Sequence, residues 1–358
     1  MRNTNKKGFT IVELVIVVAV IAILAAVLIP TFSGIIHKAR TANDTVVAKN
    51  MNTALAQYSA TNGKPENFSE VLDAMEDYGF VIANLNAKAD GNLYAWDKAN
   101  NQIVYLEYKN GNFNVIYKNV NFEEKNLCFV VATPDVQIPV GAESVALTTS
   151  PEYLKDSFAA GGEIAIAGDI KVTDDSANGK NIIKSNTTVN FGNNIVTLDL
   201  PNATNSTSNY NALRIENGTV VLDGKEGGLA TAKNAELYAL TVNASATGDS
   251  AHVTIKGGKY IGGTTAVNVV VGTVIIEGGH FEVQISDTKY LINANDTEWK
   301  NGTCDIQIKG GTFVNFDPSA NVEPENPDGR RNYLADGYKV VAETQANGDI
   351  WYTVVADK

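Results

Sequence analysis

The chain repeats one octapeptide pattern: VTIKGGKY at residues 253–260, VIIEGGHF at 274–281 and IQIKGGTF at 306–313, with a degenerate copy, LRIENGTV, at 213–220. In each copy, two alternating apolar residues precede a Gly-Gly or Asn-Gly pair, and another apolar residue ends the pattern. Alternation is typical of a half-buried strand, and glycine allows a left-handed corner. The pattern therefore predicts a strand, a bend and a second strand that face one core.

Stacked copies of such a unit would pair strand over strand and bury a continuous core. We therefore predict an all-β, right-handed parallel β-helix over residues 161–332. Lys256, Glu277 and Lys309 share one slot of the repeat, where an outward ladder of alternating charge would avoid like-charge stacking. A β-sandwich is the alternative, which the Gly-Gly recurrence disfavours.

The segments beside the repeats carry helix and hairpin signals. Ser150-Pro151-Glu152 combines an N-cap, a first-turn proline and a first-turn acid, and predicts a capping helix to Ala160 within a connector at 121–160. At the other end, residues 333–358 predict a closing hairpin with strands at 338–341 and 350–355 around Asn347-Gly348.

Residues 30–120 predict a small α+β head. Apolar residues recur at helical spacing to about Tyr58, while polar residues fill much of the other face. That polar face comprises Lys38, Arg40, Asn43, Asp44 and Lys49. A short helix capped by Ser69 should follow, and then an antiparallel meander with strands at 92–96, 103–108 and 113–117.

Residues 9–29 are apolar except for Thr10 and Glu13. As a helix they would span roughly 31 Å, about the hydrocarbon thickness of a bilayer. A secretory signal peptide and a plain membrane anchor are alternatives, yet neither explains Glu13. A charge at the bilayer centre costs about 2.5–3.5 kcal/mol on insertion scales, so this carboxylate requires a reason.

The stretch KKGFTIVEL at residues 6–14 closely resembles the type IV prepilin signature, which pilins and pseudopilins share. The resemblance implies that residues 1–8 are a leader, whose charge comes from Lys6 and Lys7. It also implies that a prepilin peptidase cuts after Gly8 and that the new amino terminus, Phe9, is methylated.

The same resemblance implies how subunits assemble. Glu13 falls at the fifth mature position, where the family keeps a glutamate that pairs with the amino group of Phe9 on an adjacent pilin subunit. Pairing would relieve the burial of both charges and fix the axial register. Pro30 lies where many pilin helices carry a proline, which should kink or loosen the helix.

Composition excludes several classes of site. The net charge of −12 argues against nucleic-acid binding, which requires clustered Lys and Arg. The two cysteines, Cys128 and Cys304, lack metal-ligand spacing, and either two buried thiols or one bridge would fit them. The three histidines share no close spacing, so we expect no metal and no cofactor.

A catalytic role is considered because many β-helices act on polysaccharides, and such sites need clustered acids. The acids here are isolated in sequence, apart from Asp174-Asp175 on a predicted turn. The isolated acids are Asp169, Asp199, Asp223, Glu277 and Glu282. We therefore expect no catalytic site and no enzymatic activity.

These patterns favour a type IV pilin-like subunit, anchored in the membrane and then assembled into a surface pilus. The β-helical outer domain would serve adhesion or display, with a host or environmental glycan or protein as the partner. A pseudopilin of a secretion or DNA-uptake system is one alternative. A surface-tethered polysaccharide-acting enzyme is the second.

Overall fold

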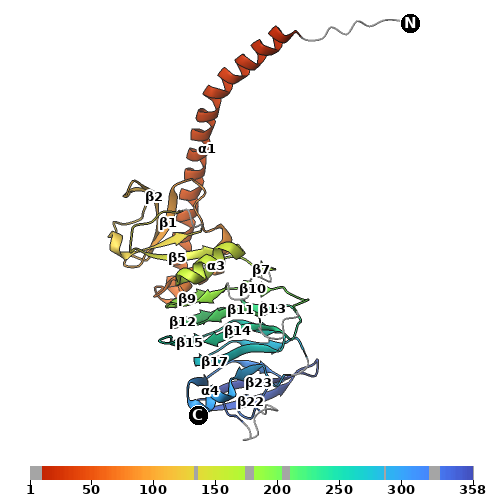
Figure 1. Ribbon diagram of the computed structural model, residues 1–358. Helices are drawn as coiled ribbons and strands as arrows, with labels where there is room; N and C mark the ends of the chain where they lie inside the picture. Colours follow the sequence, from red (N-terminus) through yellow and green to blue (C-terminus); the bar gives the residue numbers. More distant parts are fainter. Residues whose placement is uncertain are drawn as a thin grey trace, which may run out of the picture.

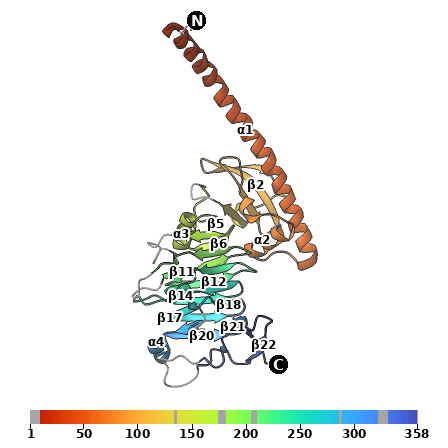
Figure 2. The same ribbon diagram turned by 90° about the vertical axis from the view of Figure 1, so that its right-hand side faces the viewer.

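The computed structural model describes residues 10–132, 136–173, 181–203, 210–285, 288–321 and 331–357. A long helix projects from a small β-rich head, and the head continues into a stack of short strands (Figure 1). The start of the helix and the end of the chain lie at opposite ends of the molecule in Figures 1 and 2.

Helix α1 spans Ile11–Asn62 and continues without interruption through Pro30. Its first half buries nothing within the chain, and Ile11 is 82% exposed. Its second half carries an apolar stripe that packs on the head, where Leu55 is fully buried. By length and composition, α1 could cross a membrane.

The head follows the predicted order. A short helix, α2, is followed by an antiparallel meander of three strands in the order β3-β2-β1. The elements are α2 (Phe68–Asp77), the 3₁₀ turn η1 (Ile82–Asn84), β1 (Asn92–Asp97), β2 (Gln102–Lys109) and β3 (Asn112–Tyr117). The N-cap of α2 is Asn67, so the predicted cap is wrong by two residues. The Asn67 side-chain oxygen accepts a hydrogen bond from the Glu70 N–H at 3.1 Å. The predicted cap, Ser69, lies inside the helix, and its Oγ accepts a hydrogen bond from Asn190 instead.

The sheet of the head runs on into the rest of the chain. Strand β4 pairs antiparallel with β1 on one side and parallel with β5 on the other, so one sheet spans both parts. Helix α3 covers the start of the stack, with Leu154 and Phe158 buried in its core (Figure 1). The elements are η2 (Glu124–Asn126), β4 (Leu127–Val131), β5 (Glu143–Thr148) and α3 (Pro151–Ala160).

Beyond α3 the strands form three parallel ladders, which the chain visits in a fixed order. The first ladder continues the head sheet with β6 (Gly162–Ile166), β9 (Thr187–Asn190), β12 (Gly218–Asp223), β15 (Ala251–Ile255), the end of β17 (Thr265–Ile276) and β20 (Cys304–Ile308). The second ladder contains β7 (Ile170–Val172), β10 (Ile195–Leu198), β13 (Gly228–Thr231), β16 (Lys259–Gly262), β18 (His280–Val283) and β21 (Thr312–Val314). The third contains β8 (Ile182–Ile183), β11 (Tyr210–Ile215), β14 (Leu237–Asn243), the start of β17 and β19 (Ile292–Ala294).

The ladders belong to two large, mostly parallel sheets, because β17 passes from the third ladder into the first. The parallel pairing predicted for the repeats is therefore confirmed, whereas their closure into a right-handed coil stays a prediction. A short helix, α4 (Asp296–Asn301), precedes β20. The C-terminal hairpin of β22 (Tyr338–Thr344) and β23 (Ile350–Ala356) pairs antiparallel with β21 and extends the second ladder.

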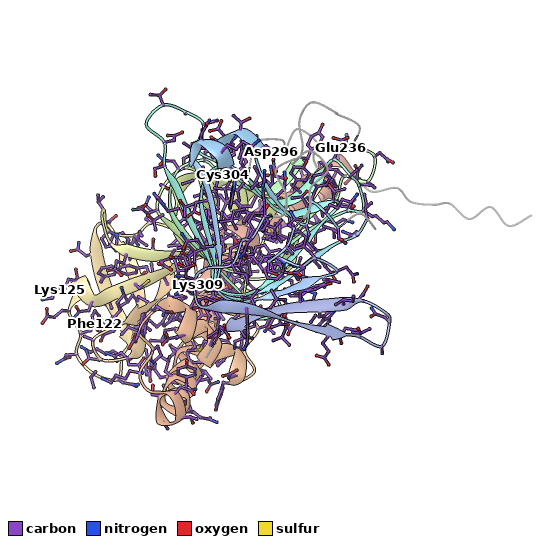
Figure 3. The ribbon with its side chains drawn as sticks, turned by 90° about the horizontal axis from the view of Figure 1, so that it is seen from below. Phe122, Lys125, Glu236, Asp296, Cys304 and Lys309 are labelled. Atoms are coloured by element: carbon purple, nitrogen blue, oxygen red, sulfur yellow. The ribbon has the colours of Figure 1, made fainter. Side chains whose placement is uncertain are left out.

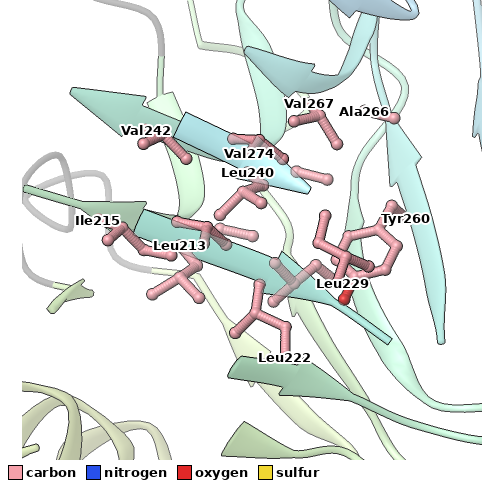
Figure 4. Packing of buried hydrophobic residues seen from close by; sticks show 14 of the residues in the cluster. Leu213, Ile215, Leu222, Leu229, Leu240, Val242, Tyr260, Ala266, Val267 and Val274 are labelled. Carbon is pink, nitrogen blue, oxygen red and sulfur yellow. The ribbon is translucent and has the colours of Figure 1, made fainter. Parts of the chain in front are cut away.

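One apolar core runs between the ladders (Figures 3 and 4). Every apolar position of the three octapeptides is buried, as predicted. One layer of this core is a ring stack in which Tyr260, Phe281 and Phe313 are fully buried, with neighbouring ring centroids 5.1 and 4.9 Å apart. Gly258, Gly279 and Gly311 turn the corners with φ between 95° and 107°, a region that only glycine adopts readily.

The degenerate copy at 213–220 is misaligned by sequence reasoning. Leu213 lies in the third ladder, opposite Leu240, whereas Val220 is the residue that pairs with Val253 in the first ladder. The true fourth copy therefore begins at Val220. The error arose because both strands alternate apolar and polar residues, and alternation alone does not distinguish one ladder from another.

The two cysteines are free thiols, and both are buried in different parts of the molecule. Cys128 lies in the head core. Cys304, which is labelled in Figure 3, lies in the core of the stack. Burial raises the pKa of each thiol to about 12. Both thiols are therefore neutral at physiological pH and pack as small apolar groups.

Candidate assembly site

The assembly site predicted from sequence begins where α1 begins. Thr10 caps the helix, and its backbone N–H and hydroxyl both lie 2.8 Å from Glu13 Oε2. In return, the Glu13 N–H donates to Thr10 Oγ1 at 3.2 Å. This reciprocal capping box gives the carboxylate partners within its own chain. The family resemblance implied a partner for the Glu13 carboxylate only on another subunit.

The surface beside Glu13 is exposed and almost wholly apolar. The side chains with the greatest exposure here surround the helix instead of forming one stripe, so no single face is turned toward the head. They include Ile11, Val12, Leu14, Val15, Ile16, Val17, Val18, Val20, Ile21, Ile23, Leu24, Val27, Leu28 and Ile29. A helix that is apolar all round is stable only in a bilayer or inside a bundle of helices.

Four predicted site residues, Lys6, Lys7, Gly8 and Phe9, lie outside the described residues. The structure therefore describes neither the predicted cleavage bond between Gly8 and Phe9 nor the Phe9 amino group that is predicted to pair with Glu13. Pro30, the predicted kink, lies inside α1. Figure 1 shows the helix gently curved along its length.

A buried carboxylate attaches the head to α1. Asp44 was predicted to lie on the polar face, and this is wrong, because its side chain is 1% exposed. Its Oδ2 accepts hydrogen bonds of 2.9 Å from the backbone N–H groups of Lys88 and Ala89 and from the Tyr105 hydroxyl. The Tyr94 hydroxyl donates to the Asp44 carbonyl at 3.0 Å. Burial raises the pKa of both tyrosines, which keeps them neutral donors.

A second polar contact holds the helix against the meander. The Asn52 side chain accepts the Ile103 N–H at 2.9 Å and donates to the Ile103 carbonyl at 2.8 Å, so it occupies one pairing position of strand β2. The spacing of residues in the sequence could have predicted which side chains of α1 face the head. Asp44, Ala48, Met51 and Leu55 are separated by three or four residues, which places the aspartate on the buried stripe.

We expect Asp44→Asn to lower the free energy of unfolding of the head by about 1–3 kcal/mol, because a neutral amide oxygen accepts these three hydrogen bonds less strongly than the charged Oδ2 and the amide NH₂ group would be buried. Urea unfolding of the full chain in detergent, followed by tyrosine and tryptophan fluorescence, measures the loss. Asp90→Asn is the matched control, since Asp90 is 92% exposed in its 3.5 Å contact with Arg40. The control should change stability by less than about 0.5 kcal/mol. Equal effects of the two variants would contradict the role of Asp44.

Helix α2 joins the head to the first turns of the stack. Lys225 Nζ lies 3.0 Å from Asp73 and 3.7 Å from Asp77, and Asn193 donates to Glu76 at 3.0 Å. These contacts and the shared sheet bind the stack to the head at two places. A pull on the outer strands is therefore transmitted to α1 through a continuous structure.

The acids singled out in the stack have separate structural surroundings. Asp169 and Asp223 accept backbone N–H groups at corners, from Ile195 and Gly224 respectively, each at 2.8 Å. Asp199 is paired with Lys171 at 2.5 Å. Asp174 and Asp175 lie outside the described residues. No cluster of three or more metal-binding side chains occurs in the part of the chain that the structure describes.

The charged slot of the octapeptide is positioned as predicted. The backbone N–H of Glu277 donates to Ile255, directly before Lys256, and that of Lys309 donates to Ile276, directly before Glu277. The three side chains therefore follow one another along one corner of the stack. Lys256 and Glu277 are exposed, and Lys309 is half-buried.

Comparison with known proteins identifies the class of the N-terminal segment. Residues 3–29 match the prokaryotic N-terminal methylation motif. The chain is 39% identical over 66 residues to the type IV major pilin protein PilE1 of Neisseria gonorrhoeae, a match that covers 18% of this chain and 40% of that protein. It is 55% identical over 51 residues to the type IV wide pilus major component PilA4 of Thermus thermophilus, covering 14% of this chain and 37% of that protein.

A third relative is the fimbrial protein of Neisseria meningitidis serogroup A, 36% identical over 66 residues, with 18% of this chain and 39% of that protein covered. The chain thus spans about 40% of the length of the curated relatives it matches. No solved structure matches the chain.

The chain is therefore type IV pilin-like, with homology to pilins over about its first 60 residues. Localisation follows from the same segment, which is typical of a membrane-anchored prepilin that later forms part of a surface pilus.

Proposed function

We propose that this protein is a filament subunit that is cut between Gly8 and Phe9, methylated at Phe9 and built into a type IV-like pilus through α1. One observation carries the proposal: residues 11–29 of α1, which lie within the methylation-motif match, are apolar on all sides except at Glu13. They are exposed and pack against no other part of the chain that the structure describes. Apolar surface of this extent requires a bilayer before assembly and neighbouring helices after it.

In the filament, Glu13 would exchange an intrachain partner for an intersubunit one. The capping box satisfies its carboxylate in the membrane, and the amino group of Phe9 on the adjacent subunit would pair with it after cleavage. Only a processed neighbour has that amino group. The exchange would therefore make assembly depend on cleavage and set the axial register between subunits.

We further propose that the three ladders form a right-handed parallel β-helix. The fixed order of first, second and third ladder, the parallel pairing and the single enclosed core all support this description. Such a coil is stiff, because each turn hydrogen-bonds to the turns before and after it.

The proposed role of the outer body is adhesion or display, and we propose no catalytic role for it. The stack lies at the end of the molecule opposite the start of α1, which supports an outward orientation in a filament (Figures 1 and 2). Asp169, Asp199 and Asp223 are each used singly, in turns and an ion pair, an arrangement that suits a binding surface better than paired-acid hydrolysis.

The amino terminus of the mature protein tests this assignment. We expect intact-mass and terminal-peptide measurements on protein from sheared filaments to find Phe9 as the first residue, carrying one methyl group. Gly8→Val should retain residues 1–8 and abolish incorporation into filaments, because a β-branched residue cannot adopt the backbone conformations that glycine provides at the cut.

Gly34→Val is the matched control, since a side chain at Gly34 meets no atom within 4 Å. Its processing should be normal. Filament protein that begins at Met1, or a Gly8→Val chain that is cut normally, would contradict the proposed function.

A further inference from the structure

A groove of about 590 Å³ runs along the outer face of the second ladder. Because Tyr260 and Phe281 point into the core, the residues on either side of them point outward. Lys259 is paired with His280 in the ladder, and Ile261 is paired with Glu282, so these four residues form the floor. The rim consists of the corners at 224–226, 257–258 and 279, with Trp351 at the far end.

The length of the groove follows from the strand spacing. Its lining residues lie at the corner before β13, on β16 and β18 with their corners, and at Trp351 of β23, whose ring reaches over β21 to the His280 ring. Three steps of about 4.8 Å from β13 to β21 give roughly 14 Å. Such a length suits an oligomer better than a single small molecule. Strands β18, β21 and β22 lie together on one side of the molecule in Figure 2.

The charged groups of the groove are already paired with one another. Glu226 lies 2.5 Å from Lys259, Glu282 lies 3.6 Å from His280, and Lys225 is paired with Asp73 of the head. The neighbouring His280 lowers the pKa of Glu282, which keeps this carboxylate ionised. A charged ligand would have to displace these partners, whereas hydroxyl groups can add to them as donors and acceptors. The groove therefore suits an uncharged, polar ligand.

Trp351 provides the apolar contact in this polar groove. Its side chain is 38% exposed and meets the His280 ring at a centroid distance of 5.3 Å and an angle of 69°. Strand β23 holds it in place, since Trp351 is paired with Val314 and the Thr353 hydroxyl lies 3.2 Å from that of Thr312. An exposed indole ring binds flat apolar faces, and its N–H donates to a polar group.

The floor does not favour a peptide. Strands β16 and β18 each pair with a neighbour on both sides, so no backbone edge is open for an added strand. Four rim residues, at 224, 257, 258 and 279, are glycines, and a Cβ at Gly257 would lie 2.6 Å from the Gly224 carbonyl oxygen. The rim is therefore low at these glycines, which allows a chain to lie lengthwise.

We propose that this groove binds a neutral oligosaccharide lengthwise, with a sugar ring against Trp351 and hydroxyl groups on the Glu226–Lys259 and His280–Glu282 pairs. Sugars combine apolar C–H faces with hydroxyl groups, which matches an aromatic ring beside paired charges. This inference rests on the proposed adhesive function and identifies its ligand class.

The test titrates the full chain, purified in lauryldimethylamine oxide to avoid sugar headgroups, with hexaose probes in a calorimeter. Cellohexaose, maltohexaose and mannohexaose are the neutral probes, and hexagalacturonate is the anionic one. We expect at least one neutral hexaose to bind. Trp351→Ala should weaken that binding about ten-fold or more, the loss of one aromatic contact of about 1.4 kcal/mol. Glu282→Gln should weaken it as well.

Val341→Ala is the matched control, because Val341 is a 49% exposed apolar residue on the other strand of the same hairpin and does not line the groove. It should bind like the unmodified chain. The proposal is overturned if no neutral hexaose binds, if hexagalacturonate binds more tightly, or if Trp351→Ala binds equally well. Immunogold labelling of filaments on the cells that produce each variant separates the proposed oligosaccharide groove from the proposed pilin function. Labelled filaments without hexaose binding refute only the groove, whereas absent filaments refute the pilin assignment.

Discussion

Replacing Glu13 with glutamine is expected to lower the incorporation of the subunit into filaments by more than about 100-fold. Glutamine preserves the capping contact with Thr10, but it cannot neutralise the amino group of a neighbouring Phe9 inside the apolar filament core. Leaving one buried charge without its partner costs about 3–5 kcal/mol, which corresponds to more than 100-fold in an assembly equilibrium. The measurement compares subunit in sheared filaments with subunit in whole cells by immunoblot.

Thr10→Val is the matched control for this experiment. It removes the hydroxyl that accepts the Glu13 N–H at 3.2 Å and leaves the carboxylate intact. Loss of a cap costs about 1 kcal/mol, so incorporation should fall about five-fold at most. If Thr10→Val abolished assembly while Glu13→Gln assembled normally, the carboxylate would act through helix capping and not through an intersubunit ion pair.

Replacing Phe281 with alanine is expected to lower the free energy of unfolding of the stack by about 3–5 kcal/mol. Its ring lies between those of Tyr260 and Phe313, with interplanar angles of 13° and 9°, and all three are fully buried. Truncation would leave a cavity between two turns that are held in register by backbone hydrogen bonds and cannot collapse around it. Urea unfolding of the full chain, followed by far-ultraviolet circular dichroism, gives the loss.

Phe281→Leu is the companion variant, because leucine keeps most of the apolar volume while it removes the ring stacking. It should cost about 1–2 kcal/mol. If Phe281→Ala lowered the free energy of unfolding by less than about 1 kcal/mol, the stack of strands would tolerate a cavity between the rings of Tyr260 and Phe313. The ring stack would then not hold successive turns together.

The continuity of the sheet affects how the outer body can be studied. Strand β4 pairs with β1 through Ala95, Trp96 and Asp97, so a deletion of everything after residue 120 would expose the edge of the head sheet. If cells with such a deletion no longer attached to a surface, the cause could be either a damaged head or the missing adhesive surface. Point substitutions in the groove avoid this ambiguity.

Sequence reasoning predicted those elements whose signals are local. Helix α3 has the predicted bounds, because Ser150, Pro151 and Gly161 set its ends through short-range hydrogen bonds and fixed backbone angles. The inward residues of the octapeptides followed from alternation with a period of two. The corner glycines followed from the left-handed conformation that such bends require.

Contacts between segments far apart in the chain could not be predicted from the sequence. The burial of Asp44 depends on backbone N–H groups that lie 44 and 45 residues further along the chain. The alignment of Val220 with Val253 depends on the ladder in which each strand lies. The groove beside Trp351 depends on a hairpin that returns to pair with β21. No local pattern contains that information.

The sequence by itself determined that a charged residue interrupts an apolar helix within a methylation motif, and that a strand–corner–strand unit recurs in the second half of the chain. Both are encoded in neighbouring residues, through side-chain periodicity and backbone preference. Only the tertiary structure decided which carboxylates are buried, which strands are paired and which side chains share a surface. Those outcomes depend on hydrogen bonds and packing between segments far apart in the chain.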